Sequence, residues 1–341
     1  MEKRISGKLI AALVAIVFSS TSFIALADNG DQSAGQGQAQ SSDSKNQTNN
    51  QKGQKGDQGP SVRLGKPSRD IETDADQQNY DQEDGGISGV AVTGARVFGK
   101  RGEKAAGQAS GSKVLLLTKH SGNPMTTTHL YSIYWGSTFK TGYKDAVNAF
   151  LNTISTAPLN TVTNQYFVSP TKNQMTYSGT YLDSTSNPPT SAPTTASILA
   201  EVYRAVVTLG KGTLDPAGLY LVFTDNFPSQ TRYCAWHGSG SVNNQSFTIA
   251  YQPFLGTVSG CSANSMTGYS VGSTISGVDA VANVASHEIY ETITDPQGNA
   301  WFDSSRDEIG DKCAWYFGST KVGAYSVQTE WSNAKSGCAT S

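Results

Sequence analysis

The stretch GVDAVANVASHEIYETITDP, residues 277–296, limits the folds open to this chain of 341 residues more than any other segment. Its apolar residues recur at the period of an α-helix, and Pro296 is typical of a helix end. The apolar stripe consists of Val278, Val281, Ala285 and Ile289. A helix with such a stripe has to bury it, and we expect this one to pack against a β-sheet.

The same helix presents polar groups on another face. His287 and Glu291 are four residues apart, so that their side chains share one side of the helix. The zinc-hydrolase signature H-E-x-x-H clasps a metal ion with this spacing, although here Glu291 takes the place of the second histidine. Glu288 would lie beside the ion, where a carboxylate can take a proton from metal-bound water. The pattern therefore predicts a metal site with Glu288 as its catalytic base.

A third ligand has to come from elsewhere in the chain. The acidic segment downstream, DSSRDEIGDKC, offers Asp303, Asp307, Glu308 and Asp311. We expect Glu308 or Asp311 to complete the metal set and leave a position open for water, and His237 is the alternative ligand. Zn²⁺ is the ion that the helix motif predicts, and Ca²⁺ is the alternative because carboxylates dominate the set. The plainer interpretation of so short a pattern is a polar helix face near an acidic loop.

The remaining segments predict a mixture of strands and helices. Continuous apolar or aromatic runs predict strands at 113–120, 129–136, 218–227 and 246–254, with a late strand at 325–333. Helical spacing predicts helices at 143–156 and 196–210, the second of them capped by a threonine and closed by Gly210. The order follows no regular βαβ period. We therefore expect an α+β fold: a single zincin-like domain whose mixed β-sheet packs against the H-E-x-x-E helix and a backing helix.

The N-terminal quarter of the chain is typical of an exported protein. A basic start, an apolar run and the small-x-small site Ala25-Leu26-Ala27 predict a signal peptide over residues 1–27. Residues 28–88 are rich in Gln, Ser, Asn and Gly and then acidic, which predicts a disordered linker, or alternatively a removable pro-segment. The folded domain is expected at residues 89–341. We expect secretion, whether to a periplasm, the cell surface or the medium, and no membrane span once the signal is removed.

The four cysteines all lie in the C-terminal third of the chain. An even number of cysteines in an exported protein favours two disulfides. Three connectivities are open, and we expect the sequential pairs Cys234–Cys261 and Cys313–Cys338. A zinc site made of all four cysteines is disfavoured because no C-x-x-C pair is present.

Read as one pattern, the stretch from residue 277 to 313 resembles the phosphate-induced protein 1 family, which includes the plant EXORDIUM proteins. The matching residues are Gly277, Val278, Asp279, His287, Glu288, Glu291, Thr294, Asp295, Pro296, Asn299, Ala300, Trp301, Glu308, Ile309, Asp311 and Cys313. Weaker similarities, in YSIYWG, GLYLVFTDN and CAWH, extend the resemblance to residues 115–338. The resemblance implies an extracellular protein, tied in plants to cell expansion and growth signalling. It brings no firmly assigned biochemical activity, and its motif is similar to that of zincin-type metallohydrolases.

Two functions follow from these patterns. The first is a secreted metal-dependent hydrolase that acts on peptides or on a cell-wall or other extracellular substrate. The second is a non-catalytic extracellular module in which the same acids hold a structural ion or a hydrogen-bonded turn. Glu288 discriminates between them, because a structural site needs no acid between its two ligands.

Other chemistries are disfavoured by the sequence. A net charge of −2 without a basic block gives no reason to expect nucleic acid as a partner. A serine hydrolase is disfavoured because the chain has no G-x-S-x-G motif, and the GSGS after His237 is interpreted as a flexible loop. His120 and His129 are interpreted as ordinary surface or packing histidines. The oligomeric state is not indicated.

Overall fold

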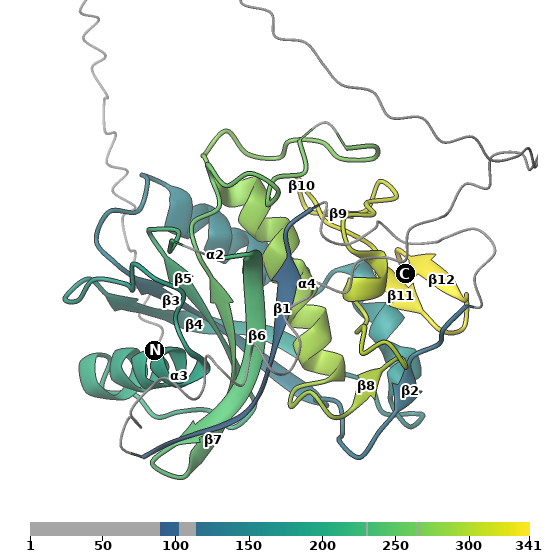
Figure 1. Ribbon diagram of the computed structural model, residues 1–341, viewed down its shortest axis with the longest axis horizontal. Coiled ribbons are helices and arrows are strands. Elements are labelled where there is room, and N and C mark those ends of the chain that lie inside the picture. The colour runs from purple at the N-terminus through teal and green to yellow at the C-terminus, as the bar shows by residue number, and fades with distance from the viewer. Residues whose placement is uncertain (1–88, 102–113, 230, 265) are drawn as a thin grey trace, which may run out of the picture. The chain divides into compact units, whose positions relative to one another are not determined.

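Helix α4, Val278–Thr294, lies in the interior of the domain, between the main sheet and the C-terminal segments (Figure 1). This computed structural model describes residues 89–101, 114–229, 231–264 and 266–341, which all belong to one structural unit. The predicted signal peptide and linker, residues 1–27 and 28–88, lie outside the described residues. Gly277 allows the helix to begin where it does: its φ is +87°, and a Cβ there would lie 2.8 Å from Phe254.

Six strands form the main sheet, in the order β1-β6-β7-β5-β3-β4. They are β1 (Val90–Gly99), β3 (Thr127–Trp135), β4 (Gln174–Asp183), β5 (Gly218–Thr224), β6 (Tyr233–Val242) and β7 (Gln245–Gln252). Strands β4, β3, β5 and β7 are parallel, β6 is antiparallel to β7, and β1 is antiparallel to β6. The sheet is therefore mixed, and the predicted α+β class is confirmed.

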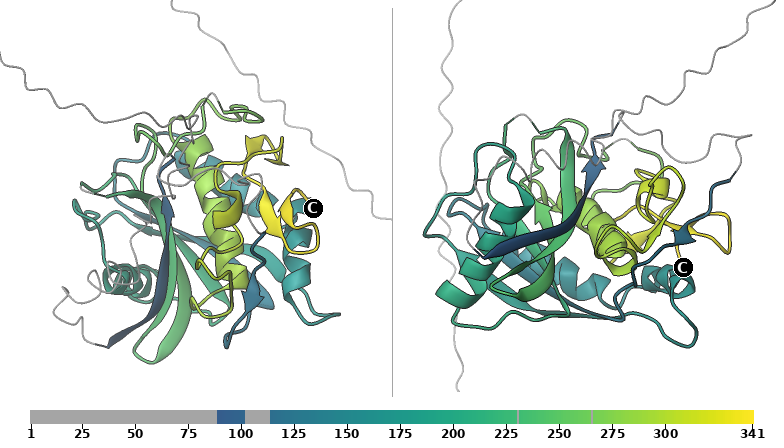
Figure 2. Two further views of the ribbon diagram at one scale, coloured as in Figure 1. Left: turned by 45° about the vertical axis from the view of Figure 1, so that its right-hand side comes forward. Right: turned by 60° about the horizontal axis from the view of Figure 1, so that its bottom comes forward.

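Helices cover both faces of this sheet (Figure 2). Helix α2, Tyr143–Ile154, packs with α4 on one face, and α3, Thr195–Tyr203, continues into the π-helical turn η2, Arg204–Leu209, on the other. Strand β5 divides its side chains between the two cores: Leu219, Leu221 and Phe223 face α2 and α4, whereas Tyr220 and Val222 face α3. A strand buried on both faces needs a continuous apolar run, and GLYLVFT provides one.

The remaining elements are short and lie mainly in the C-terminal part. They are β2 (Thr118–Lys119), η1 (Pro158–Tyr166), β8 (Trp301–Phe302), η3 (Asp311–Cys313), β9 (Lys321–Val322), β10 (Tyr325–Ser326), β11 (Glu330–Ser332) and β12 (Gly337–Ala339). Both expected disulfides are present, Cys234–Cys261 and Cys313–Cys338. The second one joins η3 to β12. None of the helices in the described ranges is long and apolar enough to cross a membrane.

Three local predictions differ from the structure. The late strand expected at 325–333 is interrupted, because it contains β10 and β11, which pair with different strands. Within the strand expected at 113–120, the described residues form a strand at Thr118–Lys119 alone, and this strand pairs with β8. The GSGS after His237 is not a loop but part of β6. Its glycines serve close packing: a Cβ on Gly238 would lie 2.5 Å from the Gly94 carbonyl of β1, and one on Gly240 would lie 2.3 Å from the Ala91 carbonyl.

Candidate metal centre

The polar face of α4 points into the protein interior. Every residue of this helix except Asp279 is buried. His287 and Glu288 are 0% exposed and Glu291 is 1% exposed. The polar face of α4 is therefore not exposed to solvent, and its ionisable groups need compensating partners because they are buried.

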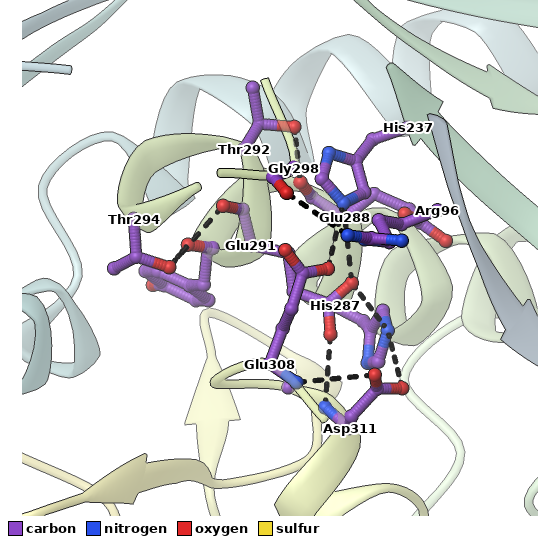
Figure 3. Close-up of polar contacts among 12 residues, drawn as sticks. Arg96, His237, His287, Glu288, Glu291, Thr292, Thr294, Gly298, Glu308 and Asp311 are labelled. Carbon is purple, nitrogen blue, oxygen red and sulfur yellow. Dashed lines mark hydrogen bonds and ion pairs between the residues drawn. The ribbon is translucent and has the colours of Figure 1, made fainter. Parts of the chain in front are cut away.

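Four ligand atoms from three parts of the chain converge beside α4 (Figure 3). Glu291 Oε2 lies 3.0 Å from His287 Nε2, one turn earlier on the helix, and 3.6 Å from His237 Nε2 on β6. His237 Nε2 in turn lies 3.1 Å from Glu308 Oε2, in the loop before η3. His237, Glu291 and Glu308 thus form a group able to hold a metal ion, with His287 attached to it through Glu291.

The spacing of His237, Glu291 and Glu308 fits a tetrahedral ion. Ligand atoms about 2.1 Å from such an ion are about 3.4 Å apart, and His237 Nε2 lies 3.6 Å from Glu291 Oε2 and 3.1 Å from Glu308 Oε2. His287 is not part of this group and contacts it through Glu291. An imidazole nitrogen with two carboxylate oxygens is a donor set that suits Zn²⁺ better than Ca²⁺, which takes oxygen ligands. One oxygen of Glu308, Oε1, has no hydrogen-bond partner among the described residues although it is buried. The residues present therefore fit a zinc ion.

Asp311 has a different position from the one that the sequence suggested. Its backbone N–H donates a 3.0 Å hydrogen bond to Glu291 Oε1, so the loop holds this carboxylate through the main chain. Its Oδ1 lies 3.9 Å from His287 Nε2, and its Oδ2 accepts from the Glu308 N–H at 3.3 Å. Asp311 thus orients Glu291 and Glu308, whereas His237, the alternative in the sequence, is the residue grouped with them.

Glu288 lies next to this set. Its carboxylate, together with His287 and Glu291, forms the second group of potential ligand atoms, all of them within 4.8 Å of one another. The helix turns by about 100° from one residue to the next, so Glu288 approaches the group from a different side than His287 does. This is the position in which a carboxylate can exchange a proton with a molecule held by the other residues.

The cluster carries more acid than the surrounding cations balance. Burial, and Glu291 nearby, raise the pKa of Glu308 well above its usual range. Burial and Glu308 raise the pKa of Asp295, at the end of α4, to about 7. Burial also lowers the pKa of His237, which favours its neutral, ligating form. A bound cation would compensate this excess of carboxylates, and protons are the alternative.

Four further residues at the cluster were not singled out from the sequence. Arg96 of β1 is the register partner of His237 and donates to the Gly298 carbonyl at 3.0 Å. Phe98, two residues on, stacks on the His287 ring with centroids 3.8 Å apart. Glu330 of β11 is buried, and neither of its carboxylate oxygens has a hydrogen-bond partner in the described part of the chain. The sequence does not reveal them, because none belongs to a short motif, and only their positions in the fold bring them to the cluster.

Gln328 is the fourth of these residues, and it determines where the proton of His287 lies. Its side-chain oxygen accepts from the Trp315 N–H at 3.3 Å, and its nitrogen donates to the Gly310 carbonyl at 2.8 Å. The same nitrogen lies 3.0 Å from His287 Nδ1, which therefore accepts. In this arrangement a neutral His287 carries its proton on Nε2, toward Glu291. Metal ligation through Nε2 requires the other tautomer, in which Nδ1 donates.

The remaining candidates lie outside the cluster. Asp303 forms an ion pair with Lys312, 2.6 Å long, and its backbone N–H donates to the Asp307 carbonyl. His120 stacks on Phe302, with ring centroids 3.6 Å apart. His129 lies at the start of β3, where its Nδ1 is 2.5 Å from the Asp215 carboxylate. The two histidines are surface and packing groups, as expected.

The chain matches no protein-family model, no curated protein and no solved structure. The resemblance to the phosphate-induced protein 1 family therefore rests on the quoted motifs.

Proposed function

We propose that this protein is a secreted metal-dependent hydrolase with a zincin-like arrangement, related to the phosphate-induced protein 1 family. The observation that supports it most is the convergence of His237 Nε2, His287 Nε2, Glu291 Oε2 and Glu308 Oε2 from a strand, a helix and a loop. The two disulfides are typical of proteins in oxidising compartments and agree with export.

In this proposal, His237, Glu291 and Glu308 hold a zinc ion and leave its fourth position to water, and His287 supports the ligand Glu291. A bound zinc ion supplies Lewis acidity, which activates water and polarises a carbonyl group. Glu288 takes the proton from the attacking water on its carboxylate and passes it to the leaving group. Asp311 keeps Glu291 in place through the hydrogen bond from its backbone N–H.

The substrate class is a peptide or another extracellular polymer. Peptide bonds are the substrate favoured by the similarity of the helix to the H-E-x-x-H signature. A cell-wall substrate is the alternative that the family resemblance favours.

Elemental analysis of the purified mature protein tests the metal. We expect roughly one zinc ion per chain in the unchanged protein and none in His237→Ala. Glu201→Gln is a matched control, because Glu201 is also buried on a helix but lies on the other face of the sheet. Absence of metal from the unchanged protein would refute the proposal.

The Glu288→Gln variant tests catalysis separately. It keeps the shape of the side chain and removes its ability to take up a proton. We expect unchanged zinc content and a loss of peptide hydrolysis of about 100-fold or more. Full activity of this variant would show that Glu288 is not the base.

A non-catalytic module is the second candidate, and two observations favour it. The ligand set is 0–1% exposed, as in a structural site. Because Gln328 donates to His287 Nδ1, a neutral His287 carries its proton on Nε2. This tautomer suits a hydrogen-bonded cluster without metal. In this case chelation lowers the melting temperature, or leaves it unchanged if no ion is held, and no hydrolysis is detected with any peptide.

A further inference from the structure

The closure of the candidate metal centre depends on one strand. Strand β1 lies at the edge of the main sheet, next to β6 and α4 (Figure 1). It turns Arg96 and Phe98 toward the cluster, where Phe98 stacks on His287 and on Trp315, with centroids 3.8 and 4.9 Å apart. Phe98 is 0% exposed. A hydrolase whose ligands are all buried needs a way to admit its substrate, and β1 contacts the cluster at two histidines, at His237 through the ladder and at His287 through Phe98.

Strand β1 is hydrogen-bonded along one edge. Among the described strands it forms a ladder only with β6, and the register shifts twice along the pair. Phe98 is its only buried residue, and the others are exposed or half-buried. Its C-terminal end is attached by the Arg101 N–H, which donates to the Gly260 carbonyl, and by Lys100 Nζ, which donates to the Thr231 carbonyl.

The edge of β6 is shaped to receive an extended backbone. Side chains at Gly238 and Gly240 of β6 would collide with the β1 carbonyls. Glycine at these two positions therefore allows an extended backbone to lie against β6. The residue before Gly238 is His237, which faces the acids and is paired with Arg96 (Figure 3). An extended peptide on this edge would place one side chain beside the carboxylate cluster and another, two residues later, over the His287 ring.

We propose that β1 occupies the place of an extended peptide substrate, so that the chain closes its own site with a strand that exchanges for the substrate. The preferred peptide carries an arginine and, two residues further on, an aromatic residue, as β1 does. The arginine binds the excess of carboxylates, and the aromatic ring stacks on the imidazole. This inference rests on the proposed hydrolase function, but its central test requires neither metal nor catalysis.

Hydrogen exchange of the intact protein tests whether β1 opens as a unit. We expect the β6 amides that bond to β1 to exchange at least 10-fold faster than the amides of β5. Phe98→Ala should accelerate them by about a further 10-fold, with no change in β5. Val97→Ala is the control, because Val97 lies on the same strand but packs on the opposite core. Equal exchange of β6 and β5 in every variant would show that β1 is a fixed part of the fold and would overturn the proposal.

A nicked protein tests the exchange with a peptide. Residues 104–109 are replaced by the recognition sequence of a site-specific protease, and cleavage separates β1 from the rest of the chain. The probe is a fluorescein-labelled peptide with the sequence of residues 89–101. We expect the nicked protein to bind it, the same peptide with Arg96→Ala and Phe98→Ala to bind at least 10-fold more weakly, and the peptide with Val97→Ala to bind within about 3-fold.

The possible outcomes separate this inference from the proposed function. Failure of the nicked protein to bind the labelled peptide, or equal binding of the peptide with both substitutions, overturns the exchange of β1. Specific binding without any hydrolysis of the peptide in the presence of zinc supports the exchange and contradicts the hydrolase.

Discussion

Gly310 lies directly against the imidazole ring of His287. A Cβ placed on Gly310 would be 2.6 Å from His287 Nδ1 and 2.9 Å from Cε1. The backbone of Gly310 has φ −77° and ψ −39°, which any residue adopts. Glycine is therefore required here by the contact with the His287 ring and not by the backbone conformation. The loop that carries Glu308 and Asp311 can approach the helix this closely only with glycine at this position.

The Gly310→Ala variant should therefore displace His287 or the loop. We expect a loss of about 1–3 kcal/mol in the free energy of unfolding, because the closely packed ring has no free space to move into. We also expect zinc affinity to fall about 10-fold or more, because a displaced His287 disturbs the orientation of the ligand Glu291. Urea unfolding and zinc titration measure the two effects. Gly212→Ala is the control, since its nearest neighbour is the movable Tyr181 hydroxyl at 3.1 Å. Unchanged affinity and stability would contradict the close contact.

The different positions of His237 and Asp311 predict unequal losses of zinc affinity when each residue is substituted. The binding free energy of a structural zinc ion, about 10–16 kcal/mol, is shared by its ligands, so removal of one costs roughly 3 kcal/mol, or about 100-fold. We expect such a loss for His237→Ala. Asp311→Asn should cost about 10-fold or less, because the Asp311 backbone N–H, not its side chain, bonds to Glu291. Competition with a fluorescent zinc chelator gives the zinc dissociation constants of both variants. A larger loss of affinity in Asp311→Asn than in His237→Ala would show that Asp311 is the ligand.

The disulfide Cys313–Cys338 should stabilise the domain strongly. It closes a loop with a sequence separation of 25 residues, for which chain entropy predicts about 3.5 kcal/mol. We expect the variant with both cysteines replaced by serine to lose about this amount in urea unfolding under oxidising conditions. The variant without Cys234–Cys261, with a separation of 27 residues, should lose a similar amount. A loss below 1 kcal/mol in the free energy of unfolding of both variants would show that the disulfides do not stabilise the domain by restricting the unfolded chain.

Asp215 should make stability dependent on acid pH. Burial acts to raise the pKa of this carboxyl, but hydrogen bonds from His129, the Ala217 N–H and Tyr131 outweigh it, and the pKa is lowered. A lowered pKa in the folded state adds stability above the unfolded value near 3.8, and this stability is lost as the pH falls through the folded pKa. Asp215→Asn should therefore cost about 2 kcal/mol at pH 7 and less at pH 3. Urea unfolding at both pH values measures the difference, and a loss that is the same at pH 7 and pH 3 would contradict this role.

The local features of the candidate site were predictable, and those that depend on distant segments were not. The sequence predicted α4 and its end, because helical periodicity and Pro296 act within a few residues. It predicted β5, whose apolar run is long enough for a strand buried on both faces. It did not predict β6, because Gly238 and Gly240 resemble a loop until the backbone of β1 lies against them.

The sequence by itself determined that His287, Glu288 and Glu291 share one helix, since the spacing of residues along a helix is a property of the local backbone. Only the tertiary structure decided which distant groups join them. The register of β6 brings His237 to Glu291, the turn before η3 brings Glu308, and β1 places Phe98 on the His287 ring. These contacts form between segments far apart in the chain, where the burial of side chains, and not the order of residues, determines which groups meet.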